Sequence, residues 1–277
     1  MDEVVPPSVL PLPRVRTARA DVWFVAVTAL RTQLRMTRHN IEDLMPVLTI
    51  PLLTLVSLAI FVQAGRADLA DRALVASLLM TLGQMGLFVG SEVVARDRTQ
   101  QTLELAVAAP GSYFVVLATR IFMLTLLGVL GFLEGWLIAR LCFGVQVRLA
   151  HPLLFTTAVL ATTLATTGTC LITAAFTSLL PNARTLQHAL NGPFYLLGGV
   201  LVPVTLLPDW VQPLTRINYF YWSANLLRAA MRPEPPEQVA LSLLAILALG
   251  LASAGLGLWL LQRAFQHLRR HGTLGLT

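Results

Sequence analysis

Charged residues, threonines and leucines are interleaved at residues 92–110, a stretch that reads EVVARDRTQQTLELAVAAP and lies between two long apolar runs. Its first part is expected to continue the preceding run as a helix through Asp97. Thr99, or Thr102 if the next helix starts later, could then cap a second, short helix by accepting hydrogen bonds from its first free amides. The sequence therefore predicts a helix, a turn and a second helix at this place.

The side chains of the second helix decide what chemistry the stretch could do. Leu103 and Val107 would share one face, Glu104 would lie on another, and Pro110 would end the helix. A short helix that exposes leucine-sized side chains has the geometry of helix-in-groove recognition. The chemistry is then binding of a partner protein, and a connector that packs on its own chain is the alternative.

Patterns that carry catalysis or hold a metal are missing from the sequence, which has no HExxH, no GxSxG and no Cys/His metal spacing. Cys142 and Cys170 are expected to be small buried hydrophobic residues, and Asp68 with Asp71 to be solvated charges of a short loop. All 20 basic residues are arginines. A phosphate-binding loop needs a lysine, so any ATP-driven work would require an ATPase on another chain.

The composition indicates an integral membrane protein. Of the 277 residues, 56% are hydrophobic and 12% charged, about half the charged fraction of an ordinary soluble domain, and the mean hydropathy is +0.70. Apolar runs near the ~20 residues that cross the hydrocarbon predict an all-α fold with six spans, at 44–62, 73–91, 113–141, 153–179, 189–207 and 239–261. The six-span domain is expected to cover 41–262.

Arginine placement predicts the orientation of these spans. With six spans, one side of the membrane carries Arg14, Arg16, Arg19, Arg31, Arg35, Arg38, Arg96, Arg98, Arg184, Arg263, Arg269 and Arg270. Arginines on the other side are mostly balanced by acids. The positive-inside rule then places both termini in the cytoplasm, with 1–16 as a disordered start and 263–277 as a cytoplasmic tail. The net charge of +6 thus reports topology and indicates no nucleic-acid partner.

Residues 17–40 are predicted to form an amphipathic helix at the membrane interface. One stripe at helical spacing is apolar and begins at Trp23, and a second stripe is formed by Arg31, Arg35 and Arg38. The helix could simply anchor the first span. Its arginine-rich end could also contact a cytoplasmic partner.

The long segment 203–236 on the opposite side is broken by prolines and rich in aromatic residues. Two short helices that dip into the outer leaflet, a re-entrant hairpin, fit this pattern. The aromatic side chains could anchor the hairpin or form an outer gate, and they are Trp210, Tyr219, Phe220, Tyr221 and Trp222.

Few polar side chains lie inside the predicted spans. Glu134 could contact a cationic substrate or carry a proton, or it could reach the outer interface, and Arg120 is expected to reach the opposite interface. Thr163, Thr166 and Thr173 fall roughly on one face, where they could pack helices together or line a translocation path.

Glycines in the third and last spans are predicted to permit close helix packing. They are Gly131, Gly135 and Gly255.

The stretch 92–110 resembles the inner loop of the type 2 ABC exporter permease family, in which an acid, a basic pair and a Gly-Thr-Leu-Glu core precede a Pro. The matching residues are Glu92, Arg96, Arg98, Thr102, Leu103, Glu104, Ala109 and Pro110, with Gln101 in place of the glycine. Residues 207–210, Asn218 and Arg228 match the family's outer segment, with Tyr219 in place of a proline. The resemblance extends over nearly the whole chain through short motifs.

The resemblance implies a complex of two permease chains, identical or related, with two cytoplasmic ATPase chains. ATP and Mg would be bound by the ATPases, and this chain would hold no cofactor. The substrate would be a hydrophobic or amphiphilic drug, natural product or lipid, exported across the plasma membrane. A lipid-linked polysaccharide is the alternative within the family, and an ion-coupled carrier is the alternative outside it.

Overall fold

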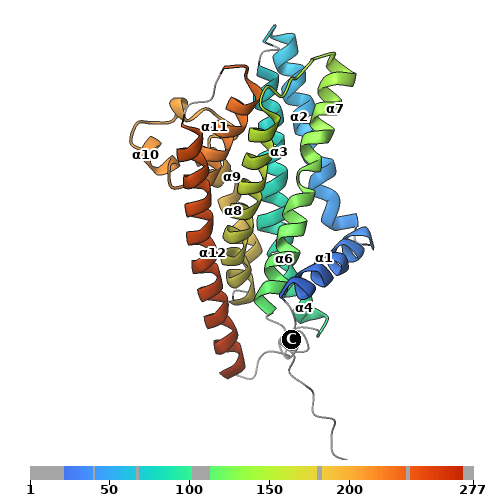
Figure 1. Cartoon of the computed structure of the whole chain (residues 1–277), viewed down its shortest axis with the longest axis vertical. Coiled ribbons are helices and arrows are strands. Elements are labelled where there is room, and N and C mark those ends of the chain that lie inside the picture. Colours follow the sequence, from blue (N-terminus) through green and yellow to red (C-terminus); the bar gives the residue numbers. More distant parts are fainter. Residues whose placement is uncertain are drawn as a thin grey trace, which may run out of the picture.

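Long apolar runs dictate helices, because a backbone in hydrocarbon must satisfy its own hydrogen bonds. The computed structural model of the chain describes residues 22–39, 41–66, 69–101, 113–179, 183–234 and 238–270, and every regular element in these ranges is a helix (Figure 1). Five helices there are long and apolar enough to cross a membrane: Met45–Gln63, Ala70–Asp97, Tyr113–Phe143, Pro152–Ser178 and Val239–Gln266. The all-helical membrane fold predicted from the sequence is confirmed.

The second and third of these spans each combine several elements. Before them, α1 (Val22–His39) and the short η1 (Ile41–Leu44) lead into α2 (Met45–Gln63). The second span joins α3 (Ala70–Gly83), the π-helix η3 (Gln84–Gly90) and α4 (Glu92–Thr99), and the third joins α6 (Tyr113–Leu127) and α7 (Leu130–Phe143). The helix of the second span thus continues through Asp97, as the sequence predicts.

Glycines let the π-helix η3 sit close to its neighbours. A Cβ on Gly86 would lie 2.5 Å from Cγ2 of Thr166, and one on Gly90 would lie 3.1 Å from Sγ of Cys170. Both contacts are with α8 (Pro152–Leu179). The π-helical part of the second span therefore packs directly on α8.

The fifth predicted span is not one continuous helix. Instead, α9 (Ala183–Leu197) ends where Gly199 takes a left-handed conformation with φ of +62°. Gln187 at the start of α9 donates to Ser91 beside α4, and Phe194 near its end accepts from Asn218 beside α11 (Tyr219–Met231). Fifteen residues of helix reach about 22 Å, less than the ~30 Å of hydrocarbon. A single helix over 189–207 is wrong, and six crossings stay a prediction.

The segment after α9 folds into short helices at one end of the bundle, with η4 (Val204–Leu206), α10 (Gln212–Thr215) and α11. Asn218 caps α11, since its side chain accepts a hydrogen bond from the amide of Phe220 at 3.0 Å. Figure 1 shows α10 and α11 at the upper end, and α1, α4 and the last turns of α12 (Val239–Arg270) at the lower end. The two ends are called the hairpin end and the α4 end below.

Close packing by glycine is confirmed at two predicted positions and wrong at the third. A Cβ on Gly131 would collide with Thr81, and one on Gly135 would lie 3.0 Å from Leu74, whereas a Cβ on Gly255 would meet nothing within 4 Å. The glycines of α12 that touch α8 are Gly250 and Gly257.

The last helix also extends beyond its predicted end at 261, because α12 continues to Arg270. Residues 263–270 of the predicted tail are therefore helical. The guanidinium of Arg263 lies 4.0 Å from the ring centroid of Trp259, a cation–π contact between the span and its extension.

Candidate functional site

Three elements meet at the α4 end around one buried ion pair. A single terminal nitrogen of Arg120, on α6, donates to both carboxylate oxygens of Asp97 on α4, at 2.9 and 2.8 Å. The two side chains are 13% and 7% exposed. This partner of Arg120 was not predicted from the sequence, and the reach of Arg120 to the interface stays a prediction.

The interfacial helix takes part in the same network. Nε of Arg120 donates to the side-chain oxygen of Gln33 on α1 at 2.8 Å. Gln33 is buried, and its amide nitrogen donates to the hydroxyl of Thr37 at 3.3 Å. The hydroxyl of Tyr113 donates to Asp97 at 3.3 Å. A charge-assisted network of this kind is stiff, because each member fixes the geometry of the next. It joins α1, α4 and α6.

A second ion pair joins α4 to the element before the first span. Arg96 pairs with Asp43 of η1, whose side chain is 2% exposed, and lies 3.5 Å from Glu92 one turn earlier on α4. Two successive residues of α4, Arg96 and Asp97, thus bind different elements, η1 and α6. Movement of α4 must therefore carry α1, η1 and α6 with it, or break buried ion pairs.

The other residues predicted for this site are placed only in part. Arg31 and Arg35 are exposed on α1, and Trp23 is 76% exposed near its start. Arg98 and Arg38 belong to α4 and α1, but their side chains, together with Thr102, Leu103, Glu104 and Pro110, lie outside the described residues.

The end of α4 shows how the turn into the next segment is made. Thr99 is the last residue of α4 and donates to the carbonyl of Arg96, so the described part places it at a helix end. Gln101 has φ of +56°, the left-handed conformation that glycine adopts most easily. A tight turn therefore follows α4 although Gln101 occupies the glycine position of the motif.

Glycine at this position is expected to stabilise the chain. Replacing Gln101 by glycine removes a Cβ from a left-handed residue, a strain of about 1–2 kcal/mol, partly offset by the greater freedom of glycine in the unfolded chain. We expect a net gain of about 0.5–1 kcal/mol, seen as a higher melting midpoint of the purified chain in detergent. Gln100→Gly is the matched control and should lower the midpoint, since Gln100 has no positive φ.

The match to a known family includes the region just described. The family model of the ABC-2 type transporter matches residues 25–232, which covers α1 to α11 and includes the whole network. The chain belongs to the ABC-2 type transporter family. No curated protein matches it closely enough to name a relative. The protein is thus a multi-pass ABC permease, the membrane part of a transporter.

Two of the threonines predicted for the path of this ABC-2 permease are packed in its core. Thr163 and Thr166 are fully buried and donate to carbonyls one turn earlier in α8, and Thr166 also accepts from the hydroxyl of Tyr219 at 3.0 Å. Thr173 differs, because it lines a cavity of about 140 Å³ between η3, α8 and α9. Glu134 is part-exposed on α7 and does not line that cavity.

The five aromatic residues predicted for the outer gate of the permease divide into two groups. Tyr219 and Phe220 are buried in the main core, where Phe220 stacks on Tyr195 of α9. Trp210 is 76% exposed, and Tyr221 and Trp222 are part-exposed. Only the last three have surface available to a substrate.

Sequence reasoning missed the residues that hold the site together, which are Asp97, Arg120, Gln33 and Asp43. A signal was present: Asp97 and Arg120 have opposite charges, and each lies near the same end of one of two consecutive spans. Opposite charges in that arrangement predict an ion pair, because an unpaired charge near hydrocarbon is costly.

Proposed function

We propose that the chain is the permease subunit of an ATP-binding-cassette exporter, powered by ATP hydrolysis on a separate ATPase chain. Two such chains, identical or related, would associate with two ATPases. The cargo would be a hydrophobic or amphiphilic drug, natural product or lipid, moved out of the cytoplasm or the inner leaflet. The observation that carries the proposal is the network of Arg120, Asp97 and Gln33 in a chain of the ABC-2 type family.

The network supports mechanical coupling. Residues 92–112 form the predicted docking segment for the ATPase. Their described part, through Gln101, is tied to η1 and α6 by the ion pairs of Arg96 and Asp97, and Arg120 links α6 to α1 through Gln33. A force on the segment would therefore move α1 and α6 with it. ATP binding would favour one arrangement of the permease by binding it better than the other.

The positions of exposed arginines support the proposed orientation of the chain in the membrane. The exposed Arg31 and Arg35 of α1 lie at the α4 end, as does Arg263 near the end of α12. The positive-inside rule assigns this end to the cytoplasm. Both termini would then be cytoplasmic, in a plasma membrane, and the hairpin end would face outward.

The cavity at Thr173 supports a translocation path beside the π-helix. Its wall combines Leu87 and Phe88 of η3 with Gln187 and Asn191 of α9, a mixture that suits an amphiphile. The side-chain oxygen of Asn191 is buried and accepts no hydrogen bond from the described residues. An unsatisfied buried acceptor is costly unless a ligand or water pairs with it.

Gentle purification from the native membrane, followed by mass spectrometry, tests the proposal. A stoichiometric chain with a Walker motif, whose ATP hydrolysis responds to amphiphiles, is the expected result. The proposal fails if the chain purifies alone and moves solute in liposomes on an ion gradient without ATP.

The docking segment yields a separate prediction. Leu103→Arg places a charge on the face expected to enter the ATPase groove, and we expect the ATPase to be lost on purification while membrane insertion is unchanged. Gln100→Arg is the matched control, because Gln100 is exposed directly after α4, outside the short helix that carries Leu103, and the substitution adds the same charge. Retention of an amphiphile-responsive ATPase by Leu103→Arg would show that the segment is not the docking element.

A further inference from the structure

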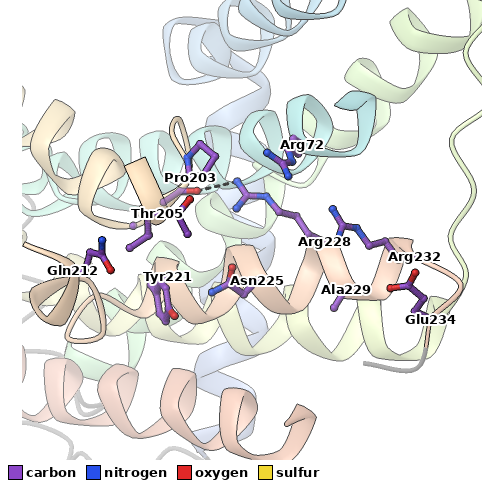
Figure 2. A pocket seen from close by; sticks show the side chains of 13 residues that line it. Arg72, Pro203, Thr205, Gln212, Tyr221, Asn225, Arg228, Ala229, Arg232 and Glu234 are labelled. Atoms are coloured by element: carbon purple, nitrogen blue, oxygen red, sulfur yellow. Dashed lines mark hydrogen bonds between the residues drawn. The ribbon is translucent and has the colours of Figure 1, made fainter. Parts of the chain in front are cut away.

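The hairpin end contains a polar cavity of about 570 Å³. It lies between the start of α3, the turn that follows α9, and one face of α11 (Figure 2). Three arginines line it, Arg72, Arg228 and Arg232, with Glu234 as the one carboxylate among its described lining residues. The cavity is therefore positively charged, and none of its arginines belongs to the network at the α4 end.

Arg228 holds the turn after α9 and retains unused hydrogen-bonding capacity. One terminal nitrogen donates to the carbonyls of Gly199 and Val200, at 2.9 and 3.2 Å. Its Nε is buried and has no acceptor among the described residues. Burial, and then the neighbouring charge of Arg72, lower the pKa of Arg228 to about 10. The group remains a cation at neutral pH, although its surroundings disfavour the charge.

Arg72 and Arg232 approach the cavity from different helices. Figure 2 shows Arg72 on α3 opposite Arg228 on α11, with Arg232 directly after the end of α11. The Asp71 carboxylate lies 3.6 Å from Nε of Arg232 and accepts a hydrogen bond from the backbone amide of Arg72. Within the described part of the chain, nothing pairs with the Arg72 guanidinium. An anion between Arg72 and Arg228 would relieve their repulsion.

Polar and apolar groups near the arginines narrow the chemistry of that anion. Arginine forks suit oxyanions, to which they donate parallel hydrogen bonds. The amides of Asn225 and Gln212 also line the cavity. On the segment that follows α9, Leu206, Trp210 and Ile217 are 73%, 76% and 69% exposed, and Leu206 directly follows Thr205, which lines the cavity.

We propose that this cavity binds the phosphate group of an amphiphile, with Arg72 and Arg228 on the phosphate and the exposed apolar residues of the hairpin against its chains. The shared chemistry is a phosphate oxyanion, which a lipid headgroup or free phosphate could provide. The apolar surface favours the lipid. The proposal concerns binding at the hairpin end and does not rest on ATP-driven export.

Binding of dioctanoyl phosphatidic acid to the purified full-length chain in detergent tests the proposal, with inorganic phosphate and dioctanoylglycerol as comparison probes. Arg72→Gln is the main variant, because the Arg72 side chain has no partner in the described part that its loss would disturb. Loss of its charge-assisted hydrogen bond is expected to weaken phosphatidic acid binding about tenfold. Arg228→Gln should weaken it further, although it also releases the turn after α9.

Arg140→Gln is the control, since Arg140 is exposed at the end of α7 and does not line the cavity. It should bind phosphatidic acid like the unmodified chain. Equal weakening by Arg72→Gln and Arg140→Gln would overturn the site, as would equally tight binding of dioctanoylglycerol. Inorganic phosphate that binds as tightly as phosphatidic acid would overturn the assignment to an amphiphile.

Discussion

Replacement of Arg120 by leucine is expected to lower the free energy of unfolding by about 3–5 kcal/mol, the range for breaking one side of a buried ion pair. The variant leaves the Asp97 carboxylate, whose side chain is 7% exposed, without its cation. Gln33 loses its hydrogen bond from Arg120 at the same time. The measurement is the melting midpoint of the detergent-purified chain by tryptophan fluorescence, which should fall by many degrees.

Arg140→Leu is the matched control for this variant. Arg140 lies in the same long span, but it is exposed and its contact is with the ring of Trp136 at 5.4 Å. Its loss should change the midpoint little, since exposed contacts of this kind contribute about 0.5–1 kcal/mol. A similar fall of the midpoint in both variants would mean that the ion pair at the α4 end contributes no more to stability than an exposed contact does.

The double variant Arg120→Leu with Asp97→Leu separates stability from coupling. Removing both charges leaves no unpaired ion, so much of the lost stability should return. Under the proposed function, this variant should fold and bind its ATPase, while amphiphiles stimulate ATP hydrolysis less. Full stimulation would show that the pair is structural and does not transmit force.

Length and hydropathy were enough to predict the membrane class and three of the six proposed spans within two residues of their structural ends. The first span is an example, predicted at 44–62 and found as α2, Met45–Gln63. Hydropathy could not predict how α9 ends. The mean hydropathy over residues 189–207 is high, but the helix ends before Gly198. Gly199 takes a left-handed conformation, which ends the series of helical hydrogen bonds.

The ion pairs were harder to predict, because they join segments that are far apart in sequence. Arg120 is 23 residues from Asp97 and 87 from Gln33. Each residue alone looks like a charge that could extend to the interface. Only the packing of α1 across α6 makes Gln33 a partner of Arg120, and no local pattern encodes that packing.

Aromatic residues of the hairpin illustrate the same limit. Composition predicts an interfacial belt for all five, but burial depends on which side of α11 faces α8 and α9. Tyr219 and Phe220 face inward and Trp222 is part-exposed, although all three are neighbours in sequence. A cluster of aromatic residues at the start of a helix cannot all share one face, so some must be core residues.

Gly250→Val is expected to disrupt the packing of α12 on α8. A Cβ at this position would lie 2.6 Å from Cα and 2.8 Å from Cβ of Ala165, so the obstacle is backbone that cannot rotate away. Overpacking of this kind costs about 1–3 kcal/mol. The helices pack along most of their length (Figure 1), and we expect a lower melting midpoint and earlier proteolysis of α12.

Gly255→Val is the matched control for this prediction. Gly255 is on the same helix and the substitution has the same helix propensity, but its Cβ would meet nothing within 4 Å. The difference between the two variants therefore measures contact with α8 alone. The sequence could not rank these glycines, because α12 is apolar on every side through its middle and no polar face reveals its rotation about its axis. Equal midpoints for the two variants would mean that α12 is rotated from the position described, with Gly250 turned away from Ala165.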